Sequence, residues 1–156
     1  MVEIRWSFEM SEDPLISIVD DDTAARAGTR ALVESLGYKA VSFSSAEHFL
    51  KSDMIRETAC LITDLQMPGL NGLELQELLR SQGYRMPIIL ITAYPNENHR
   101  IRALNGGAVG FLSKPFDEAS LIDCLTVAIK QRELDAEGEI DPRARARATV
   151  NRRSRA

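Results

Sequence analysis

Short apolar runs alternate along the chain with longer segments in which apolar and polar residues recur at helical spacing. Short runs bounded by turn residues are typical of strands, whereas the longer amphipathic segments are typical of helices. The predicted strands are 15–19, 39–43, 58–63, 87–91 and 109–112. The predicted helices are 24–36, 44–50, 71–81, 96–104 and 117–132. The apolar periodicity stops at about residue 135.

Polar residues at the starts of several segments predict where helices begin. Thr23 is a good N-cap for the first helix, and Ser44 and Glu47 have the spacing of a capping box for the second. In the polar helix 96–104, Ile101 and Leu104 are the residues that we expect to face inward. Each helix would then lay an apolar side on the sheet.

The order of the elements, strand then helix throughout, predicts the class of fold. Parallel strands joined by helical crossovers form a sheet that helices cover on both faces, with right-handed connections. The run 87–91 is wholly apolar, which indicates a strand that is buried on both sides. We therefore expect an α/β protein with a five-stranded parallel sheet, doubly wound and flavodoxin-like, in the strand order 2-1-3-4-5.

Length and charge divide the chain into three parts. A chain of 156 residues suits one domain, which the periodic region places at 14–135. A flexible leader at 1–13 precedes it, and Met10 in that leader is an alternative start. The part at 136–156 is rich in arginine and alanine and is expected to be disordered. Six arginines lie in 141–156 although the whole chain has a formal net charge of −4, so the domain itself is acidic.

The apolar runs also bear on where the protein resides. No run approaches the length of a membrane span, and the N-terminus lacks the apolar core of a signal peptide. We therefore expect a cytoplasmic protein. Cys60 and Cys124 lie in apolar segments without CxxC or metal-ligand spacing, which favours buried free thiols over a disulfide.

Charged or hydroxyl side chains follow four of the predicted strands. They are Asp20 and Asp21 after the first strand, Asp64 after the third, Thr92 after the fourth and Lys114 after the fifth. In an open parallel sheet the carboxyl ends of the strands meet at one edge, where ligands bind. Clustered carboxylates repel each other unless a cation lies between them, and hard oxygen ligands beside a phosphate suit Mg²⁺. A single acid there is often only a helix cap, but the joint occurrence predicts a site.

These motifs, taken together, resemble those of a known family. They read Val19-Asp20-Asp21-Asp22, Asp64-Leu-Gln-Met-Pro-Gly-Leu-Asn-Gly72, Ile91-Thr92-Ala93 and Lys114-Pro115-Phe116. The set resembles the response-regulator receiver domain of two-component signalling over about residues 14–132, and within that family it most resembles the FixJ-type subgroup.

The resemblance implies a phosphoacceptor site. It implies that Asp64 attacks the phosphoryl group carried by a phosphohistidine of a sensor histidine kinase or a phosphotransfer protein. It also implies that Asp20 and Asp21 hold Mg²⁺ together with Asp64 and the backbone carbonyl oxygen of Gln66. A carboxylate is already ionised at neutral pH, so this nucleophile needs no general base. His48 and His99, the only histidines, are therefore expected to be surface or packing residues.

The resemblance further implies a switch. Lys114 would pair with the phosphoryl oxygens, and its bond to Pro115 would be cis. Thr92 would donate a hydrogen bond to the phosphoryl group in the active state, and Phe111 would occupy the aromatic switch position. Gln66 and Tyr94 lie two residues beyond Asp64 and Thr92, at positions that tune hydrolysis in the family. We hypothesise that the bulk of Tyr94 restricts the attacking water.

The expected output is a change of surface. The face formed by helix 96–104, strand 109–112 and the last helix would bind a partner or a second copy in the phosphorylated state. No output domain is apparent after residue 135, so we expect a stand-alone receiver that binds a target, relays phosphate or serves as a phosphate sink. The basic tail could be a solvated remnant, or could contact nucleic acid or an acidic partner.

Three other classes compete with this interpretation. A phosphatase of the haloacid-dehalogenase type also uses an aspartyl nucleophile at a strand end, but it needs a second acid where this chain has Gln66. A flavin-binding flavodoxin shares the fold, yet the aspartates after the first strand would repel a flavin phosphate. A pseudo-receiver that works without phosphorylation usually lacks an acid or the lysine, and here the set is complete.

Overall fold

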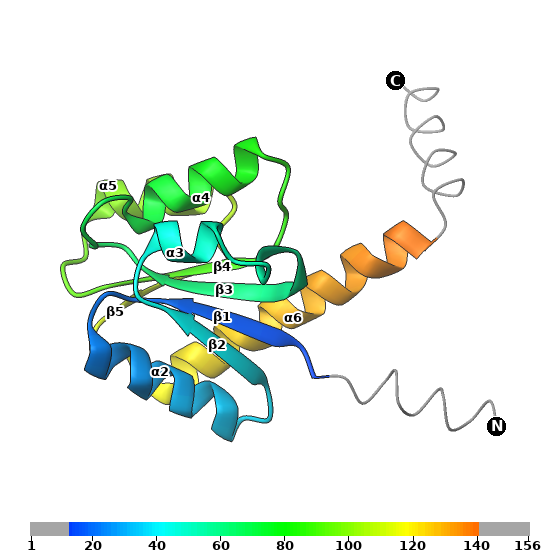
Figure 1. Ribbon diagram of the computed structural model, residues 1–156, viewed down its shortest axis with the longest axis horizontal. Helices are drawn as coiled ribbons and strands as arrows, with labels where there is room; N and C mark the ends of the chain where they lie inside the picture. Colours follow the sequence, from blue (N-terminus) through cyan, green and yellow to red (C-terminus); the bar gives the residue numbers. More distant parts are fainter. Residues whose placement is uncertain (1–12, 141–156) are drawn as a thin grey trace.

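A computed structural model describes residues 13–140 and shows a five-stranded parallel sheet with helices on both faces (Figure 1). The strands are β1 Leu15–Val19, β2 Lys39–Phe43, β3 Thr58–Asp64, β4 Ile88–Thr92 and β5 Gly110–Ser113. They are all parallel and lie in the order β2-β1-β3-β4-β5. The predicted fold class and strand order are confirmed, and the carboxyl ends of β1, β3, β4 and β5 share one edge of the sheet.

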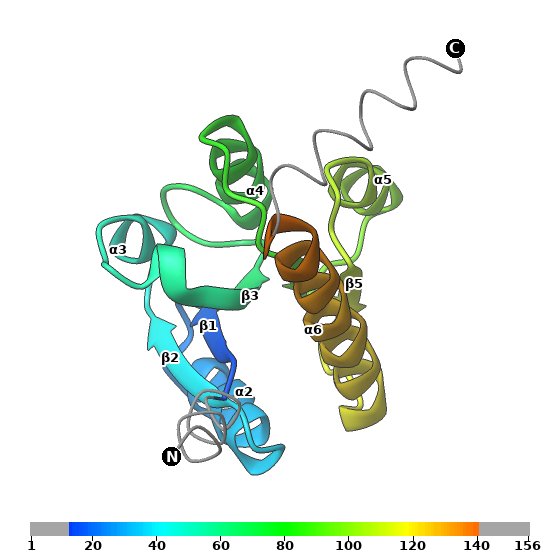
Figure 2. The same ribbon diagram turned by 90° about the vertical axis from the view of Figure 1, so that its right-hand side faces the viewer.

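The helices divide between the two faces of the sheet, as a doubly wound fold requires. They are α2 Thr23–Ser35, α3 Ala46–Leu50, α4 Gly72–Ser81, α5 Glu97–Asn105 and α6 Glu118–Ile140. The two ribbon views agree that α3, α4 and α5 cover one face and that α2 and α6 cover the other (Figures 1 and 2). A short 3₁₀ helix, Ile55–Glu57, precedes β3 and was not predicted. No described helix has the length and apolarity that crossing a membrane requires.

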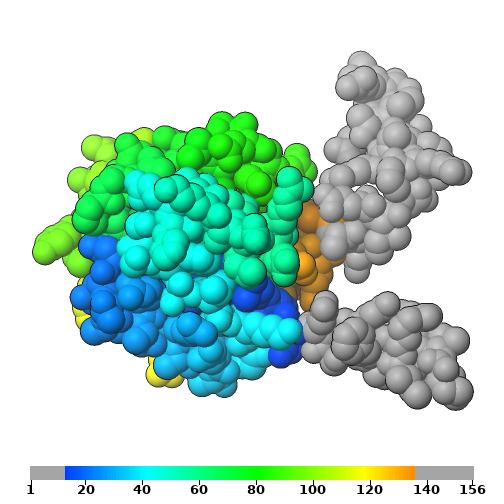
Figure 3. All heavy atoms as spheres, in the orientation of Figure 1, coloured from blue at the N-terminus to red at the C-terminus, as the bar shows by residue number. Residues whose placement is uncertain are grey.

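The alternation of side chains along the strands produces two separate hydrophobic clusters. On β3, Leu61 belongs to the cluster beneath α3 and α4, whereas Cys60 and Ile62 belong to the cluster beneath α2 and α6. Every residue of β3 and β4 is buried, which confirms the expectation for the apolar run of β4. In Figure 3 the atoms of α2 in blue, α3 in cyan and α4 in green form much of the surface on the side that is seen. Asp64 and Thr92 therefore end the two strands whose residues are all buried.

Two predicted helix starts are wrong by one residue. The N-cap of α2 is Asp22, whose carboxylate accepts a hydrogen bond from the backbone N–H of Ala25 at 2.8 Å, and Thr23 is already helical. The N-cap of α3 is Ser45, not Ser44. The expected capping partner, Glu47, instead accepts from the backbone N–H of Leu70 at 2.9 Å. Two neighbouring capping residues compete in each case, and the backbone path of the loop decides between them.

The loop after Asp64 is fixed by a true capping box at the start of α4. The Asn71 side chain accepts from the backbone N–H of Glu74 at 2.8 Å, and the Glu74 carboxylate accepts from the N–H of Asn71 at 2.9 Å. A Cβ atom on Gly72 would lie only 2.5 Å from the backbone oxygen of Asp64. The sequence Asn71-Gly72 therefore lets α4 begin directly against the strand end that carries Asp64.

The two C-terminal helices differ from expectation. Ile101 and Leu104 do not face the core, because they are 46% and 40% exposed, and Ala103 is the buried residue of α5. The last helix continues past residue 132 to Ile140, because alanine and glutamate are good helix formers and extending an existing helix is favourable. The leader and the tail beyond Ile140 lie outside the described residues.

Two glycines make a matched test of this packing. Gly28 lies inside α2, where an added Cβ meets nothing within 4 Å, so Gly28→Ala should stabilise the fold by about 0.5–1 kcal/mol. At Gly110 of β5 an added Cβ would lie 2.5 Å from Cys124 Sγ of α6, so Gly110→Ala should cost about 1–3 kcal/mol. Urea unfolding midpoints measure both changes. Cys124→Ala should relieve part of the Gly110→Ala cost, and an unrelieved cost would contradict direct packing of α6 on β5.

Candidate functional site

Three carboxylates converge at the carboxyl edge of the sheet. Asp20 and Asp21 follow β1, and Asp64 is the last residue of β3. Each offers one oxygen, and these oxygens lie within 4.8 Å of one another. Asp20 and Asp64 are 5% and 8% exposed, whereas Asp21 is exposed to solvent. The structure thus brings together the three acids that the sequence placed at the ends of two different strands.

Lys114 bridges the two buried acids. Its Nζ donates to Asp20 Oδ2 at 3.0 Å and to Asp64 Oδ2 at 3.2 Å. Burial alone would lower the pKa of Lys114, but the hydrogen bond and charge of Asp20, together with Asp64, outweigh burial and raise that pKa. The peptide bond from Lys114 to Pro115 is cis, as the resemblance implied. The ammonium group therefore stays charged and neutralises part of the acidic cluster.

Asp64 retains an unsatisfied oxygen. Burial, and then the charge of Asp20, raise the pKa of Asp64, although Lys114 opposes the shift. Among the described residues its Oδ1 is buried and has no hydrogen-bond partner. A buried acceptor without a partner costs free energy, so this atom is suited to a bound cation or an incoming group. With Asp20 and Asp21 beside it, the oxygen-only donor set fits a hard divalent cation such as Mg²⁺.

Asp20 is positioned by two contacts that the sequence did not predict. The backbone N–H of Asp22 donates to Asp20 Oδ1 at 2.9 Å. The Arg26 guanidinium on α2 donates to the backbone oxygen of Asp20 at 2.7 Å. Asp20 is thus held by α2 and Lys114 at once. The sequence did offer a signal for Arg26, a basic residue one helical turn past the N-cap Asp22.

Thr92 ends β4 with a hydroxyl that is already engaged. The residue is fully buried, and its Oγ1 donates to Gln66 Oε1 at 2.5 Å. The same Oγ1 accepts from the backbone N–H of Tyr94 at 3.0 Å. The resemblance implied that the Gln66 backbone oxygen holds Mg²⁺ and that Gln66 tunes hydrolysis, but nothing in the sequence predicted this side-chain contact with Thr92. Tyr94 is 74% exposed, and it contacts Thr92 through its backbone N–H. That the Tyr94 ring shields Asp64 from water stays a prediction.

Phe111 lies on β5 beside the same strand end. In the parallel register Phe111 pairs with Leu90 of β4. Two residues further along each strand, Ser113 pairs with Thr92. Phe111 is half-buried against the cluster beneath α3 and α4. Side chains two apart on a strand share a face, so Phe111 and Thr92 lie on the same face of the sheet.

Glu47 links α3 to the loop that follows Asp64. Its Oε2 accepts from the backbone N–H of Leu70, and this bond is the main reason that the pKa of Glu47 is lowered. Gly69 has a φ of +76°, and a Cβ there would lie 2.5 Å from the Glu47 carboxylate. The Pro-Gly turn noted in the sequence is therefore shaped to receive this acid. Nothing in the sequence indicated that Glu47 would reach across to the loop.

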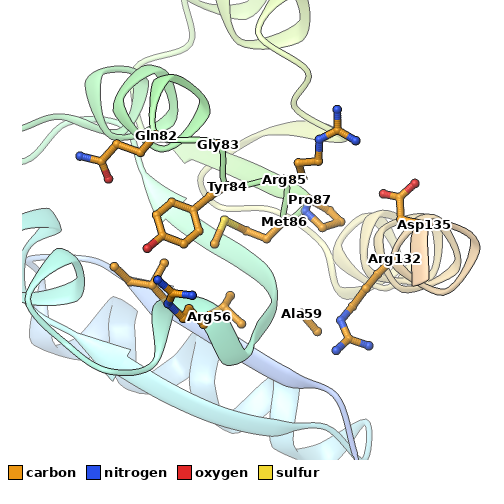
Figure 4. Close-up of a pocket in the computed structure, with 12 residues that line it drawn as sticks. Arg56, Ala59, Gln82, Gly83, Tyr84, Arg85, Met86, Pro87, Arg132 and Asp135 are labelled. Carbon is orange, nitrogen blue, oxygen red and sulfur yellow. The ribbon is translucent and has the colours of Figure 1, made fainter. Parts of the chain in front are cut away.

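Two hollows lie at opposite ends of the sheet. One of about 470 Å³ adjoins the site and is lined by Leu65, Gln66, Met67, Pro68, Asn71 and His99. The other, of about 550 Å³, is bordered by Tyr84, Met86 and three arginines, Arg56, Arg85 and Arg132 (Figure 4). In Figure 4 the Tyr84 side chain points toward Arg56, whereas the Arg85 side chain points away from Arg56. The second hollow lies at the amino ends of β3 and β4, far along the strands from Asp64.

The remaining titratable candidates lie outside the acidic cluster. His48 packs its ring against Phe43 at 5.9 Å, and His99 lines the smaller hollow with an Nδ1 that has no partner among the described residues. Cys60 is a buried free thiol, and burial raises its pKa far above the usual range. Cys124 is free and half-buried. The expectation of unpaired thiols is confirmed.

Comparisons with known proteins agree with this geometry. The family model described as response regulator receiver domain matches residues 16–126. Nodulation protein W of Bradyrhizobium diazoefficiens is 38% identical over 79% of this chain and 54% of its own length. The transcriptional regulatory protein FixJ of Azorhizobium caulinodans is 33% identical over 86% of this chain and 66% of its own length. The crystal structure of FixJ-N has a TM-score of 0.68 at 30% identity and covers 76% of this chain and 94% of its own. The chain spans about half to two thirds of the length of these curated relatives.

Adjacent acids after β1 provide a test for a divalent cation. Asp21→Asn removes a candidate ligand, whereas Asp22→Asn keeps an N-cap side chain that can accept the same hydrogen bond. Mg²⁺ at ten times its dissociation constant should stabilise the wild type and Asp22→Asn by about 1.4 kcal/mol, and should stabilise Asp21→Asn less. Thermal unfolding with and without Mg²⁺ measures the difference. Equal stabilisation of all three proteins would contradict a cation site at Asp21.

Proposed function

The chain belongs to the response regulator receiver domain family, and on that premise we propose that Asp64 accepts a phosphoryl group from a phosphohistidine. The donor is a sensor histidine kinase or a phosphotransfer protein, and the encounter takes place in the cytoplasm. The observation that carries the proposal is the buried Oδ1 of Asp64, which has no hydrogen-bond partner in the described part of the chain and lies beside two further carboxylates and a lysine. The family is one of signalling domains.

The transfer needs positioning and neutralisation of charge more than covalent assistance. A bond forms between an Asp64 oxygen and phosphorus while the phosphorus–nitrogen bond breaks, and the electron pair of that bond returns to the imidazole. Lys114, now 3.2 Å from Asp64 Oδ2, is placed to pair with the transferred oxygens. When bound by Asp20, Asp21, Asp64 and the backbone oxygen of Gln66, Mg²⁺ would supply further positive charge to those oxygens. Thr92 would add a hydroxyl donor once its present bond is broken.

The side chains around Asp64 favour a stored signal over turnover. A phosphatase of the haloacid-dehalogenase type would need an acid where Gln66 stands, and the Gln66 amide cannot act as a general acid or base. Gln66 and Tyr94 would instead set how fast water reaches the acyl phosphate. The phosphorylated domain then acts on a partner, passes the group on in a relay, or drains it from the kinase as a sink.

The output surface is proposed to be the face formed by α5, β5 and α6. Phosphorylation adds negative charge and strong acceptors at the edge of the sheet, and it would draw Thr92 and then Phe111 toward Asp64. On α5, Ile101 and Leu104 are substantially exposed, which supports a contact surface there. A second copy or a target protein would bind this face. The basic tail would contact nucleic acid or an acidic partner.

Incubation with Mg²⁺ and acetyl phosphate tests the phosphoacceptor directly. Intact-mass measurement should show the gain of one phosphoryl group in the wild type and in Asp53→Asn, a control at an exposed acid outside the cluster. Asp64→Asn should show none, because the nucleophilic carboxylate is gone. A gain that persists in Asp64→Asn would refute the assignment, as would a wild type that gains no mass.

The output face is tested by light scattering after size exclusion, with and without Mg²⁺ and beryllofluoride. If the face binds a second copy, the wild type should gain mass with the phosphoryl mimic. Ile101→Lys should abolish that gain because it charges the exposed apolar side of α5. Leu36→Lys is the control, since Leu36 is 36% exposed at the end of α2, on the side of the sheet opposite α5. A gain that survives Ile101→Lys would place the interface elsewhere.

A further inference from the structure

The contact between Gln66 and Thr92 points to a latch on the switch itself. We propose that the Gln66 side chain holds Thr92 in the resting state, so that activation requires this hydrogen bond to break. Gln66 is then a positioning residue that sets how readily the domain switches, separate from any effect on water access to Asp64. The inference rests on the proposed function, because it concerns the hydroxyl that the phosphoryl group would recruit.

The hydrogen-bonding capacity of Thr92 makes the two states mutually exclusive. A threonine hydroxyl carries a single proton, and here that proton is donated to Gln66 Oε1 at 2.5 Å. The oxygen meanwhile accepts from the backbone N–H of Tyr94 at 3.0 Å. Thr92 cannot donate to a phosphoryl oxygen on Asp64 while it donates to Gln66. The phosphoryl group and the Gln66 amide therefore compete for one proton.

The position of the latch gives it influence over the switch. Asp64 of β3 pairs with Ile91 of β4, so Gln66 and Thr92 extend from two neighbouring strand ends and tie them together. Thr92 is fully buried, so water cannot easily replace a lost partner. A ligand shifts a two-state equilibrium only by its differential affinity for the two states. Stabilisation of the resting state by Gln66 thus reduces the apparent affinity for any phosphoryl group.

The structure also provides a place for the released amide. Gln66 is half-buried and lines the hollow of about 470 Å³ together with His99. His99 Nδ1 is buried and has no partner among the residues that the structure describes. On release, the Gln66 amide can turn into this hollow, where solvent and the imidazole nitrogen can satisfy it. The amide then keeps its hydrogen bonds in both states, so the latch can open without leaving a buried polar group unpaired.

Calorimetric titration with Mg²⁺ and beryllofluoride tests the latch. Gln66→Leu replaces the amide with an apolar side chain of comparable bulk and removes the acceptor, so it should bind the mimic about three- to tenfold more tightly than the wild type. Gln66→Ala should shift affinity in the same direction. Gln82→Leu is the matched control, because Gln82 is exposed at the end of α4 and away from Asp64, and it should bind like the wild type.

A double-mutant cycle separates the latch from a general effect of the substitution. Thr92→Val removes the hydroxyl at nearly constant shape, so in that background Gln66→Leu should leave the affinity unchanged. A gain of the same size in both backgrounds would overturn the latch and indicate steric or solvent effects of Gln66. Binding by the wild type with no gain in Gln66→Leu or Gln66→Ala would also overturn it. Failure of the wild type itself to bind beryllofluoride would instead overturn the proposed function, and the latch with it.

Discussion

The ion-pair bridge from Lys114 to Asp20 and Asp64 is the interaction on which the rest of the site depends. Two buried carboxylates at neighbouring strand ends repel each other, and the edge of the sheet tolerates them because one ammonium group contacts both. The bridge spans β1, β3 and the loop after β5, so it ties the whole carboxyl edge together. It is also incomplete, since Asp64 Oδ1 has no partner among the described residues. Lys114 thus offsets part of the repulsion between the two acids, and Asp64 Oδ1 is left for a further positively charged ligand or an incoming group.

The second constraint is the single hydroxyl proton of Thr92. Lys114 holds Asp20 and Asp64 together, whereas in the proposed mechanism Thr92 would respond to the phosphoryl group. Its bond to Gln66 Oε1 connects the loop after β3 with the end of β4, and Phe111 lies on the same face of the sheet one pleat away. The acids and Thr92 thus lie at the ends of different strands, with Asp20 after β1, Asp64 at the end of β3 and Thr92 at the end of β4. Under the proposed mechanism, that separation would let Gln66 change how readily the domain switches without changing the carboxylates.

The sequence predicted the fold and the acids for the same physical reason. Each apolar run forms one strand of the sheet, and a parallel sheet with helical crossovers brings the carboxyl ends of its strands to one edge whatever the details of the loops. Asp20, Asp64 and Lys114 could therefore be placed together from their positions in the chain. Glu47, Arg26 and the Gln66 side chain could not, because each reaches its partner through a rotamer and a loop path. The positions of Ile101 and Leu104 were predicted wrongly because a polar helix has a weak apolar side, and in α5 the small Ala103 is the buried residue.

A receiver must hold a phosphoryl group long enough to signal, and it must stay off without one. In the proposed mechanism the acidic cluster alone would not keep the domain off, because the proton of the Thr92 hydroxyl is held by Gln66 and by none of the acids. Gln66 would bear on both needs from one position. Its amide offers no acid or base for hydrolysis, and its oxygen occupies the donor that an incoming group would use. An acid at this position would add charge beside Asp64, and an apolar residue would leave Thr92 free. A neutral side chain with an acceptor at its end satisfies both requirements.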